Sequence, residues 1–334
     1  MGRALTVTAA IVAQADRRVG TGHLRESLIV ARFLGKRAAL AVGARTPASF
    51  INGSRARRLA SLSPKALAAW ARAAKGAGAR VVLANLWDPS AAQARALKSA
   101  GLPVVMMDEV GGKALSADVV INPMLLSTRY LGSRARLLAG PAWLALDPLY
   151  KKLARRKRAT RGPLRRLLVT FGGLDRTGAT ARAAKLLRRL RPGLKTTLVL
   201  GPGFSDHAAL ARAVSGAAGL TLVRGATSLA RLIADSDAVL TAGGNTLCEA
   251  ACLGVPALVA HEDPHERLHG LTWQREGFAR CLGPGRRLTA RALSKALDEL
   301  DDPAARRRRG ASGRRLVDGR GAERIAELLV RFSR

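Results

Sequence analysis

The stretch AVLTAGGNT at residues 238–246 decides how the second half of the chain folds. An apolar run ends in Gly243 and Gly244, and a helical pattern begins directly after them. In Rossmann-like sheets, ligands bind beyond the carboxyl ends of the strands, at turns of this kind. We therefore expect free backbone N–H groups and the positive end of a helix dipole at this turn, where they can bind an anion.

The residues after the glycines point to a nucleotide. The backbone N–H groups of Gly243, Gly244, Asn245 and Thr246 are expected to hold a diphosphate. Glu249 follows one helical turn later on the face of Thr246, where it could accept hydrogen bonds from ribose hydroxyls. The alternative role for Glu249 is a carboxylate that only serves the helix dipole.

A second glycine turn, GTGH at residues 20–23, follows the apolar run at 5–13 and opens another helical pattern. Gly20 and Gly22 allow close approach of a ligand, and Arg25 lies on the same rim. Histidine is the residue type most often used to exchange a proton at physiological pH, so His23 is a candidate general base toward water or an acceptor hydroxyl. A helix-capping or packed histidine is an equal alternative at this position.

Apolar runs alternate with helical patterns along the whole chain, which predicts parallel sheets covered on both faces. The expected strands are 5–13, 38–42, 80–84, 103–107, 118–121, 165–170, 196–200, 220–223, 238–241 and 257–260. At 334 residues the chain suits two α/β domains. We expect Rossmann-like domains at 1–148 and 164–316, a basic linker at 149–163, and a C-terminal helix within 317–334 that could pack on either domain. The two glycine turns would then face one interdomain cleft.

Two further loops of the second domain are expected at the same cleft. Gly172 and Gly173 follow its first strand, and Asp175 is expected to cap the next helix. His265 and Glu266 follow the strand at 257–260 and are expected to touch the sugar. No zinc-type spacing accompanies them, so the sequence predicts neither a metal nor a cofactor.

The formal net charge is +34, but the arginines are spread along the chain with few aromatic residues to stack on bases. We therefore expect no specific nucleic-acid partner. Two basic runs, 151–158 and 306–309, are expected to be solvated surface, or alternatively weak contacts to anionic lipid. No apolar stretch reaches the ~18 residues of a membrane span and no signal peptide is recognisable, which predicts a cytoplasmic protein. The oligomeric state is not predicted.

Several stretches together resemble the GT-B nucleotide-sugar superfamily. They are GTGH at 20–23, GPAWLALDP at 140–148, FGGLD at 171–175, AGGNTLCE at 242–249 running on to LGVP at 253–256, and LVDGRGA at 316–322. Within the superfamily the chain looks most like the UDP-sugar hydrolase of pseudaminic acid biosynthesis and related spore-coat polysaccharide proteins. It is more distantly similar to the UDP-GlcNAc transferase of peptidoglycan synthesis.

The resemblance implies a UDP-sugar substrate, with UDP on the second domain and His23 near the anomeric carbon. In a hydrolase, His23 would deprotonate the attacking water; in an inverting glycosyltransferase it would activate an acceptor hydroxyl. Hydrolysis in surface-glycan sugar synthesis is the leading expectation. A non-catalytic nucleotide-sugar or nucleic-acid binding protein is the remaining alternative.

Three departures from the superfamily pattern fall on positions expected to face the sugar. ANLWD at 84–88 stands where an Asp-His-Tyr-like segment is expected, and DPHE at 263–266 replaces an Asn-Gln pair. Glu26 lies three residues after His23, where an arginine is expected.

Overall fold

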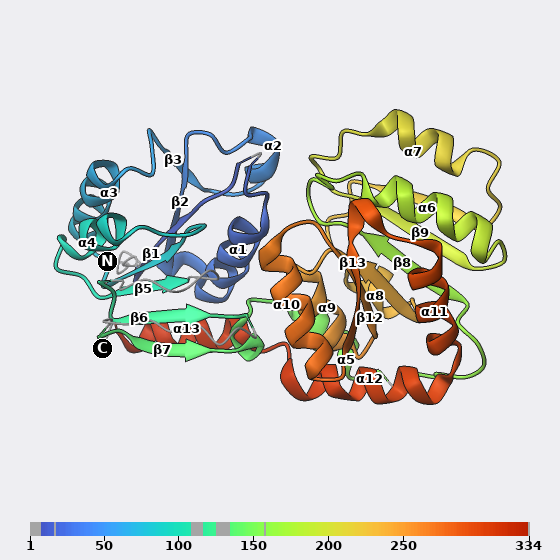
Figure 1. Ribbon diagram of the computed structural model, residues 1–334. Coiled ribbons are helices and arrows are strands. Elements are labelled where there is room, and N and C mark those ends of the chain that lie inside the picture. Colours follow the sequence, from blue (N-terminus) through green and yellow to red (C-terminus); the bar gives the residue numbers. More distant parts are fainter. Residues whose placement is uncertain (1–7, 17, 108–115, 125–133, 157, 333–334) are drawn as a thin grey trace. The chain divides into compact units, whose positions relative to one another are not determined.

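The computed structural model describes residues 8–16, 18–107, 116–124, 134–156 and 158–332 (Figure 1). The chain forms two compact units. The first unit combines Met1–Asp147 with Gly319–Arg334, and the second unit comprises Pro148–Asp318.

The first unit contains a parallel seven-stranded sheet with the order β3-β2-β1-β4-β5-β6-β7. Its strands are β1 (Ala9–Ala13), β2 (Ala38–Gly43), β3 (Arg57–Leu59), β4 (Val81–Asn85), β5 (Val104–Met107), β6 (Val119–Asn122) and β7 (Arg136–Ala139). Its helices are α1 (Gly22–Leu34), α2 (Ala48–Ile51), α3 (Pro64–Gly76), α4 (Ala91–Lys98) and α13 (Gly321–Arg331), with short 3₁₀ turns η1 (Gly35–Arg37) and η2 (Pro141–Trp143).

Side chains of the central strands alternate between two cores, because successive residues of a strand point to opposite faces. Val81 and Leu83 of β4 pack with residues of α1 and α13, whereas Val82 and Ala84 pack with residues of α3 and α4. Every residue of β1, β4, β5 and β6 is buried. The continuous apolar runs in the sequence therefore follow from helices on both faces of the sheet.

The second unit contains a parallel six-stranded sheet with the order β10-β9-β8-β11-β12-β13. Its strands are β8 (Arg166–Thr170), β9 (Lys195–Leu200), β10 (Leu220–Arg224), β11 (Ala238–Thr241), β12 (Ala257–His261) and β13 (Ala279–Pro284). Its helices are α5 (Pro148–Ala154), α6 (Ala179–Leu190), α7 (His207–Val214), α8 (Ala230–Ala234), α9 (Thr246–Leu253), α10 (Pro264–Arg275), α11 (Ala290–Asp301) and α12 (Pro303–Leu316), with the 3₁₀ turn η3 (Gly285–Arg287).

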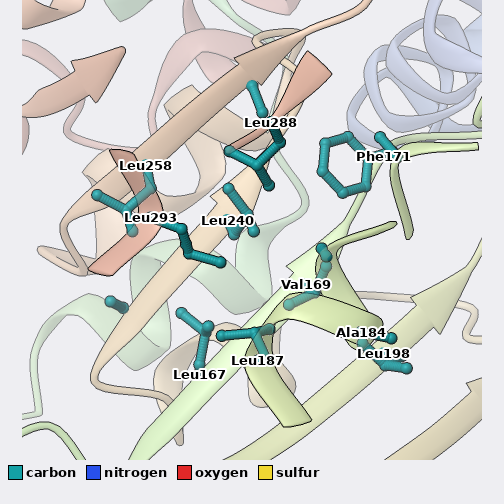
Figure 2. Packing of buried hydrophobic residues seen from close by; sticks show 14 of the residues in the cluster. Leu167, Val169, Phe171, Ala184, Leu187, Leu198, Leu240, Leu258, Leu288 and Leu293 are labelled. Carbon is teal, nitrogen blue, oxygen red and sulfur yellow. The ribbon is translucent and has the colours of Figure 1, made fainter. Parts of the chain in front are cut away.

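One core of the second unit joins the sheet to α6 and α11. Figure 2 shows Leu167, Leu240 and Leu258 from three neighbouring strands, with Leu187 of α6 and Leu293 of α11 among the residues around them. All five side chains are buried. This packing fixes the sheet from which the loops of the candidate site extend.

The predicted fold class is confirmed: both units are α/β with parallel sheets. Three strands were not predicted. The outer strands β3 and β7 are short and largely exposed, so they carry no continuous apolar run. In β13, Arg280 and Gly283 interrupt the pattern. Residues 5–7 of the first expected strand lie outside the described residues.

The predicted linker at 149–163 is corrected by the structure, because this segment belongs to the second unit. Residues 148–154 form α5, whose buried Tyr150 and Leu153 face the unit, and α5 packs on α8 and α9. Arg158 donates hydrogen bonds to the carbonyl oxygens of Ala234 and Ser236 at the end of α8. The residue before it, Lys157, lies outside the described residues.

The C-terminal helix α13 belongs to the first unit, which settles the alternative left open by the sequence. Ile325 and Leu329 are fully buried in the core shared with β1 and β4. Gly321 lies so close to Leu144 that an added Cβ would be 2.0 Å from the Leu144 carbonyl oxygen. The chain thus leaves the first unit near residue 148 and returns to it for its last helix.

Candidate active site

Both sheets have the doubly wound strand order, in which the chain reverses direction across the sheet at one point. In the first unit this switch point lies between β1 and β4, and in the second unit between β8 and β11. Ligands of doubly wound sheets bind outside the carboxyl ends of the strands at the switch point. The Gly20–His23 turn follows β1, and the Gly243–Gly244 turn follows β11, so both predicted turns occupy a switch point.

His23 is buried at the start of α1, with 5% of its surface exposed. Its Nδ1 lies 2.9 Å from Oδ1 of Asn85, the last residue of β4. The Asn85 amide donates from Nδ2 to Glu26 Oε2 over 2.9 Å and to the His23 carbonyl oxygen over 3.1 Å. His23 is therefore held at the sheet edge by a buried polar network and does not cap the helix through its side chain.

The turn before His23 is shaped by Asp16 and Gly20. Gly20 adopts φ of +79°, which favours glycine, and donates its N–H to the Asp16 carbonyl oxygen over 2.9 Å. The Asp16 carboxylate accepts the N–H groups of Arg18 and Val19. Burial raises the pKa of Asp16, but the hydrogen bonds from Val19 and Arg18 outweigh it and lower the pKa overall. Arg17, which follows Asp16, lies outside the described residues.

Two other residues surround the imidazole of His23. The ring of Trp87 lies 5.8 Å from it between centroids, at an interplanar angle of 50°. Gln14 fixes the Trp87 backbone by accepting its N–H over 3.2 Å. Gly22 begins α1, and Arg25 is half-buried on the same helix. The segment ANLWD thus supplies two neighbours of the candidate base, Asn85 and Trp87.

In the second unit, the Gly243–Gly244 turn is packed against α10. Gly243 has φ of +130°, and a Cβ there would lie 2.8 Å from the Glu266 carbonyl oxygen. Its own carbonyl oxygen accepts a 2.7 Å hydrogen bond from Nδ1 of His269, because Nε2 of that ring accepts from the Trp273 indole. Burial lowers the pKa of His269 to about 4, which keeps the ring neutral. Only glycine fits at residue 243.

Helix α9 starts directly behind this turn and presents its first N–H groups there. Gly244 and Thr246 donate no backbone hydrogen bond to any residue that the structure describes. Asn245 occupies the N-cap position without a side-chain cap bond. Glu249 lies in the first turn and is 7% exposed. The geometry agrees with an anion cradle that has an acidic residue one turn away.

Glu266 is half-buried beside the same turn. Its Oε2 accepts the Glu262 N–H over 2.8 Å, and its Oε1 lies 3.9 Å from where a Gly244 Cβ would be. Burial raises the pKa of Glu266 to about 7, helped by the charges of Asp263 and Glu262 and opposed by the Glu262 hydrogen bond. The carboxyl group therefore changes charge near neutral pH at the edge of the proposed anion cradle.

The loop after β8 is tied to the segment that carries Glu266. Glu262 Oε1 accepts both the N–H and the hydroxyl of Thr177 over 3.0 Å, and Arg176 forms a 2.9 Å ion pair with Asp263. Asp175 is not the N-cap residue of α6, which is Gly178, but its carboxylate accepts the N–H groups of Ala179 and Thr180 at the start of the helix.

The glycines of the same loop approach a neighbouring backbone. Gly172 has φ of +69°, and Gly173 accepts the Gly203 N–H over 2.8 Å. A Cβ at Gly201 would lie 2.2 Å from the Gly172 carbonyl oxygen. His265 is half-buried on the first turn of α10, next to Glu266. Hydrogen bonds thus connect the loop after β8 to the segment before α10, and α10 in turn packs on the Gly243–Gly244 turn. The ribose role of Glu249 stays a prediction.

Sequence reasoning placed Asn85 only within the ANLWD segment and gave it no role of its own. Asn85 ends a strand at the switch point, which is a signal that could have been used. No spacing in the sequence indicated the contact of His269 with Gly243. Within the described residues, no group of three or more His, Cys, Asp or Glu side chains is placed to hold a metal ion. No described helix has both the length and the apolar character needed to cross a membrane.

Two Rossmann-like units, each with a glycine-rich turn at its switch point, define the GT-B fold. The chain superposes on MurG of Acinetobacter baumannii with a TM-score of 0.70 and 14% identity, covering 97% of this chain and 99% of MurG. It superposes on Phytolacca americana UGT2, complexed with UDP-2fluoro-glucose and pterostilbene, with a TM-score of 0.66 and 14% identity, covering 99% and 100%. These similarities show the fold.

A comparison of sequences points to a smaller group of proteins than the comparison of folds. The chain is 27% identical over 234 residues to the spore coat polysaccharide biosynthesis protein SpsG of Bacillus subtilis (strain 168), covering 68% of each chain. It matches no known protein-family profile. The predicted GT-B fold and the resemblance to spore-coat polysaccharide proteins are confirmed.

Proposed function

We propose that the chain is an enzyme that breaks the anomeric C–O bond of a UDP-sugar and releases UDP. The observation that carries the proposal is the pair of switch points. One holds a buried histidine in a polar network, and the other holds the first N–H groups of α9 with Glu249 one turn away. The similarity to SpsG and the UDP-sugar ligand of UGT2 support this donor class.

In this proposal the two units have different tasks. The N–H groups of Gly244 and Thr246 hold the diphosphate, and Glu249 accepts hydrogen bonds from the ribose. His23 Nε2 takes the proton of the attacking hydroxyl group while the oxygen of that hydroxyl group bonds to the anomeric carbon. The C–O bond to the β-phosphate breaks, and UDP leaves with the electron pair, its charge spread over the α9 N–H groups.

Water is the nucleophile that we propose, as part of sugar synthesis for a surface polysaccharide. A sugar or lipid-linked acceptor is the second candidate, because UGT2, which shares the fold, is complexed with both a UDP-sugar and a second molecule, pterostilbene. Incubation with a panel of UDP-sugars, with and without candidate acceptors, separates them. UDP release in buffer alone supports hydrolysis, and release only when an acceptor is present would show transfer instead.

The role of His23 has its own test. We expect His23→Ala to abolish UDP release while the affinity for UDP, measured by calorimetry, stays within a few-fold of wild type. The reason is that the substitution removes the base in the first unit and leaves the α9 cradle in the second unit intact. Retained turnover would contradict the assignment of His23 as the base.

A further inference from the structure

In the buried network at His23, hydrogen bonds connect the His23 imidazole to the Asn85 amide and the Asn85 amide to the Glu26 carboxylate. His23, Asn85 and Glu26 are exposed by only 5%, 1% and 3%. The imidazole and the carboxylate both belong to α1, three residues apart, while the amide between them comes from the end of β4. Buried polar groups of this kind must satisfy one another, so the direction of each hydrogen bond can be worked out.

The orientation of the Asn85 amide follows from its neighbours. Its NH₂ group has two hydrogens, and two acceptors lie within reach, Glu26 Oε2 at 2.9 Å and the His23 carbonyl oxygen at 3.1 Å. A flipped amide would place its oxygen against both of these oxygens. The Asn85 oxygen must therefore face His23 Nδ1, and an oxygen without hydrogen can only accept. Nδ1 consequently carries the proton and donates it over 2.9 Å.

We propose that Asn85 and Glu26 are positioning residues that hold His23 in the Nδ1–H tautomer and leave Nε2 as the basic nitrogen. Nε2 makes no hydrogen bond with any residue in the described part of the chain. The tautomer itself is a property of the resting protein. Only its use, to remove a proton from the nucleophile, rests on the proposed function.

The residue type at Glu26 determines which groups donate and which accept along these hydrogen bonds. An arginine, which the superfamily pattern predicts at this residue, can only donate and would draw the Asn85 oxygen toward itself. The amide NH₂ would then face His23, Nδ1 would have to accept, and the proton would move to Nε2. A glutamate accepts instead, and its charge also balances the imidazolium that forms when Nε2 takes up a proton. A neutral amide alone could not supply that charge.

The tautomer is measured directly by ¹⁵N NMR of protein labelled at histidine, without any substrate. The chain has five histidines, and the His23 signals are those lost in His23→Gln. We expect Nδ1 to show the shift of a protonated ring nitrogen and Nε2 that of an unprotonated one. A protonated Nε2, or an average of both forms, would overturn the proposal even if the protein cleaves UDP-sugars.

Asn85→Leu, of similar size, removes the acceptor for Nδ1. We expect the His23 signals to become an average of the two tautomers in the folded variant, checked by circular dichroism. Retention of a pure Nδ1–H form would show that Asn85 does not set the tautomer. If the variant does not fold, the wild-type spectrum and Glu26→Gln still decide the proposal.

Glu26→Gln keeps an acceptor for Asn85 but removes the charge. We expect the tautomer to be retained and kcat to fall more than KM changes, because the charge acts on the protonated ring that forms only during the reaction. Glu323→Gln, the same substitution at an ion-paired residue of α13, is the matched control and should keep the wild-type kcat and KM. An unchanged kcat in Glu26→Gln would overturn the role of the Glu26 charge.

Discussion

Two glutamates carry most of what is particular to this chain at the residue scale. Glu26 and Glu266 both stand where the superfamily pattern predicts other residue types, and each lies in a hydrogen-bond network beside a glycine turn. The sequence could place them near the site but could not give their partners. Asn85 is 62 residues from His23 in sequence, and only the pairing of β1 with β4 brings them together.

The pKa of about 7 for Glu266 predicts a pH-dependent affinity for UDP. Below that pH the carboxyl group is neutral, and above it a carboxylate lies beside the proposed diphosphate site. We expect calorimetry to show that the UDP affinity of wild type, relative to Glu266→Gln, falls by roughly tenfold from pH 6 to pH 8. Glu276→Gln, at the far end of α10, is the control and should behave as wild type. Equal pH dependence in all three proteins would contradict the location of the diphosphate.

The raised pKa of the Glu266 carboxyl group also predicts how the stability of the protein depends on pH. The folded pKa of Glu266 lies above its ordinary value of 4.5, so its contribution is complete below about pH 4.5 and is lost as the pH rises through 7. Relative to Glu266→Gln, we expect the free energy of unfolding of wild type to decrease over this window by roughly 3 kcal/mol at most. Denaturant titrations at pH 4.5, 6 and 7.5 measure the difference. An increase would show that the carboxylate is stabilised by its surroundings.

At the scale of elements, part of the basic composition has a structural use. Arg306 is 3% exposed and donates to the carbonyl oxygens of Leu300, Asp301 and Gly162. This corrects the prediction that the whole run 306–309 is solvated surface. Contact of the remaining basic residues with anionic lipid stays a prediction.

Polar side chains also bind the backbone of the edge strand β13. Arg309 donates to the Ala279 carbonyl oxygen, and Gln274 accepts the Cys281 N–H, so side chains occupy backbone groups that a further strand could pair with. Apolar patterning predicted the ends of the buried strands within one residue, except at the start of β1, which was expected at residue 5 and begins at Ala9. It could not predict β3, β7 and β13, because these outer strands depend on neighbours and carry charged or glycine residues.

Docking of α13 on the first unit depends on the absence of a side chain at Gly321. A Cβ there would lie 2.0 Å from the Leu144 carbonyl oxygen, which is backbone and cannot move without shifting the chain. We expect Gly321→Ala to reduce the free energy of unfolding by about 1–3 kcal/mol in thermal or denaturant unfolding. Gly76→Ala, at a helical glycine with open space around it, is the control and should be neutral or slightly stabilising. A neutral Gly321→Ala would contradict the close approach.

At the scale of the whole molecule, the two units repeat one design with different contents. Each has the doubly wound order and a glycine turn at its switch point, but the helix behind the first turn begins with the buried His23, whereas the helix behind the second turn has the acidic Glu249 in its first turn. The sequence predicted this division because both turns follow apolar strands. It could not predict the path of the chain between the units. The segment of α5 was expected to be a linker but belongs to the second unit, and the C-terminal helix α13, for which either unit was possible, belongs to the first.

The proposed function requires that the Gly243–Gly244 turn and Glu249 form a UDP site. Thermal unfolding with UDP, GDP and CMP tests it most directly, since a ligand at a hundred times its dissociation constant adds about 2.7 kcal/mol to stability. We predict that UDP stabilises the protein selectively, and that Glu249→Ala weakens UDP binding by roughly 1–3 kcal/mol through loss of the bonds to the ribose. No stabilisation by UDP, or equal stabilisation of wild type and Glu249→Ala, would contradict the account.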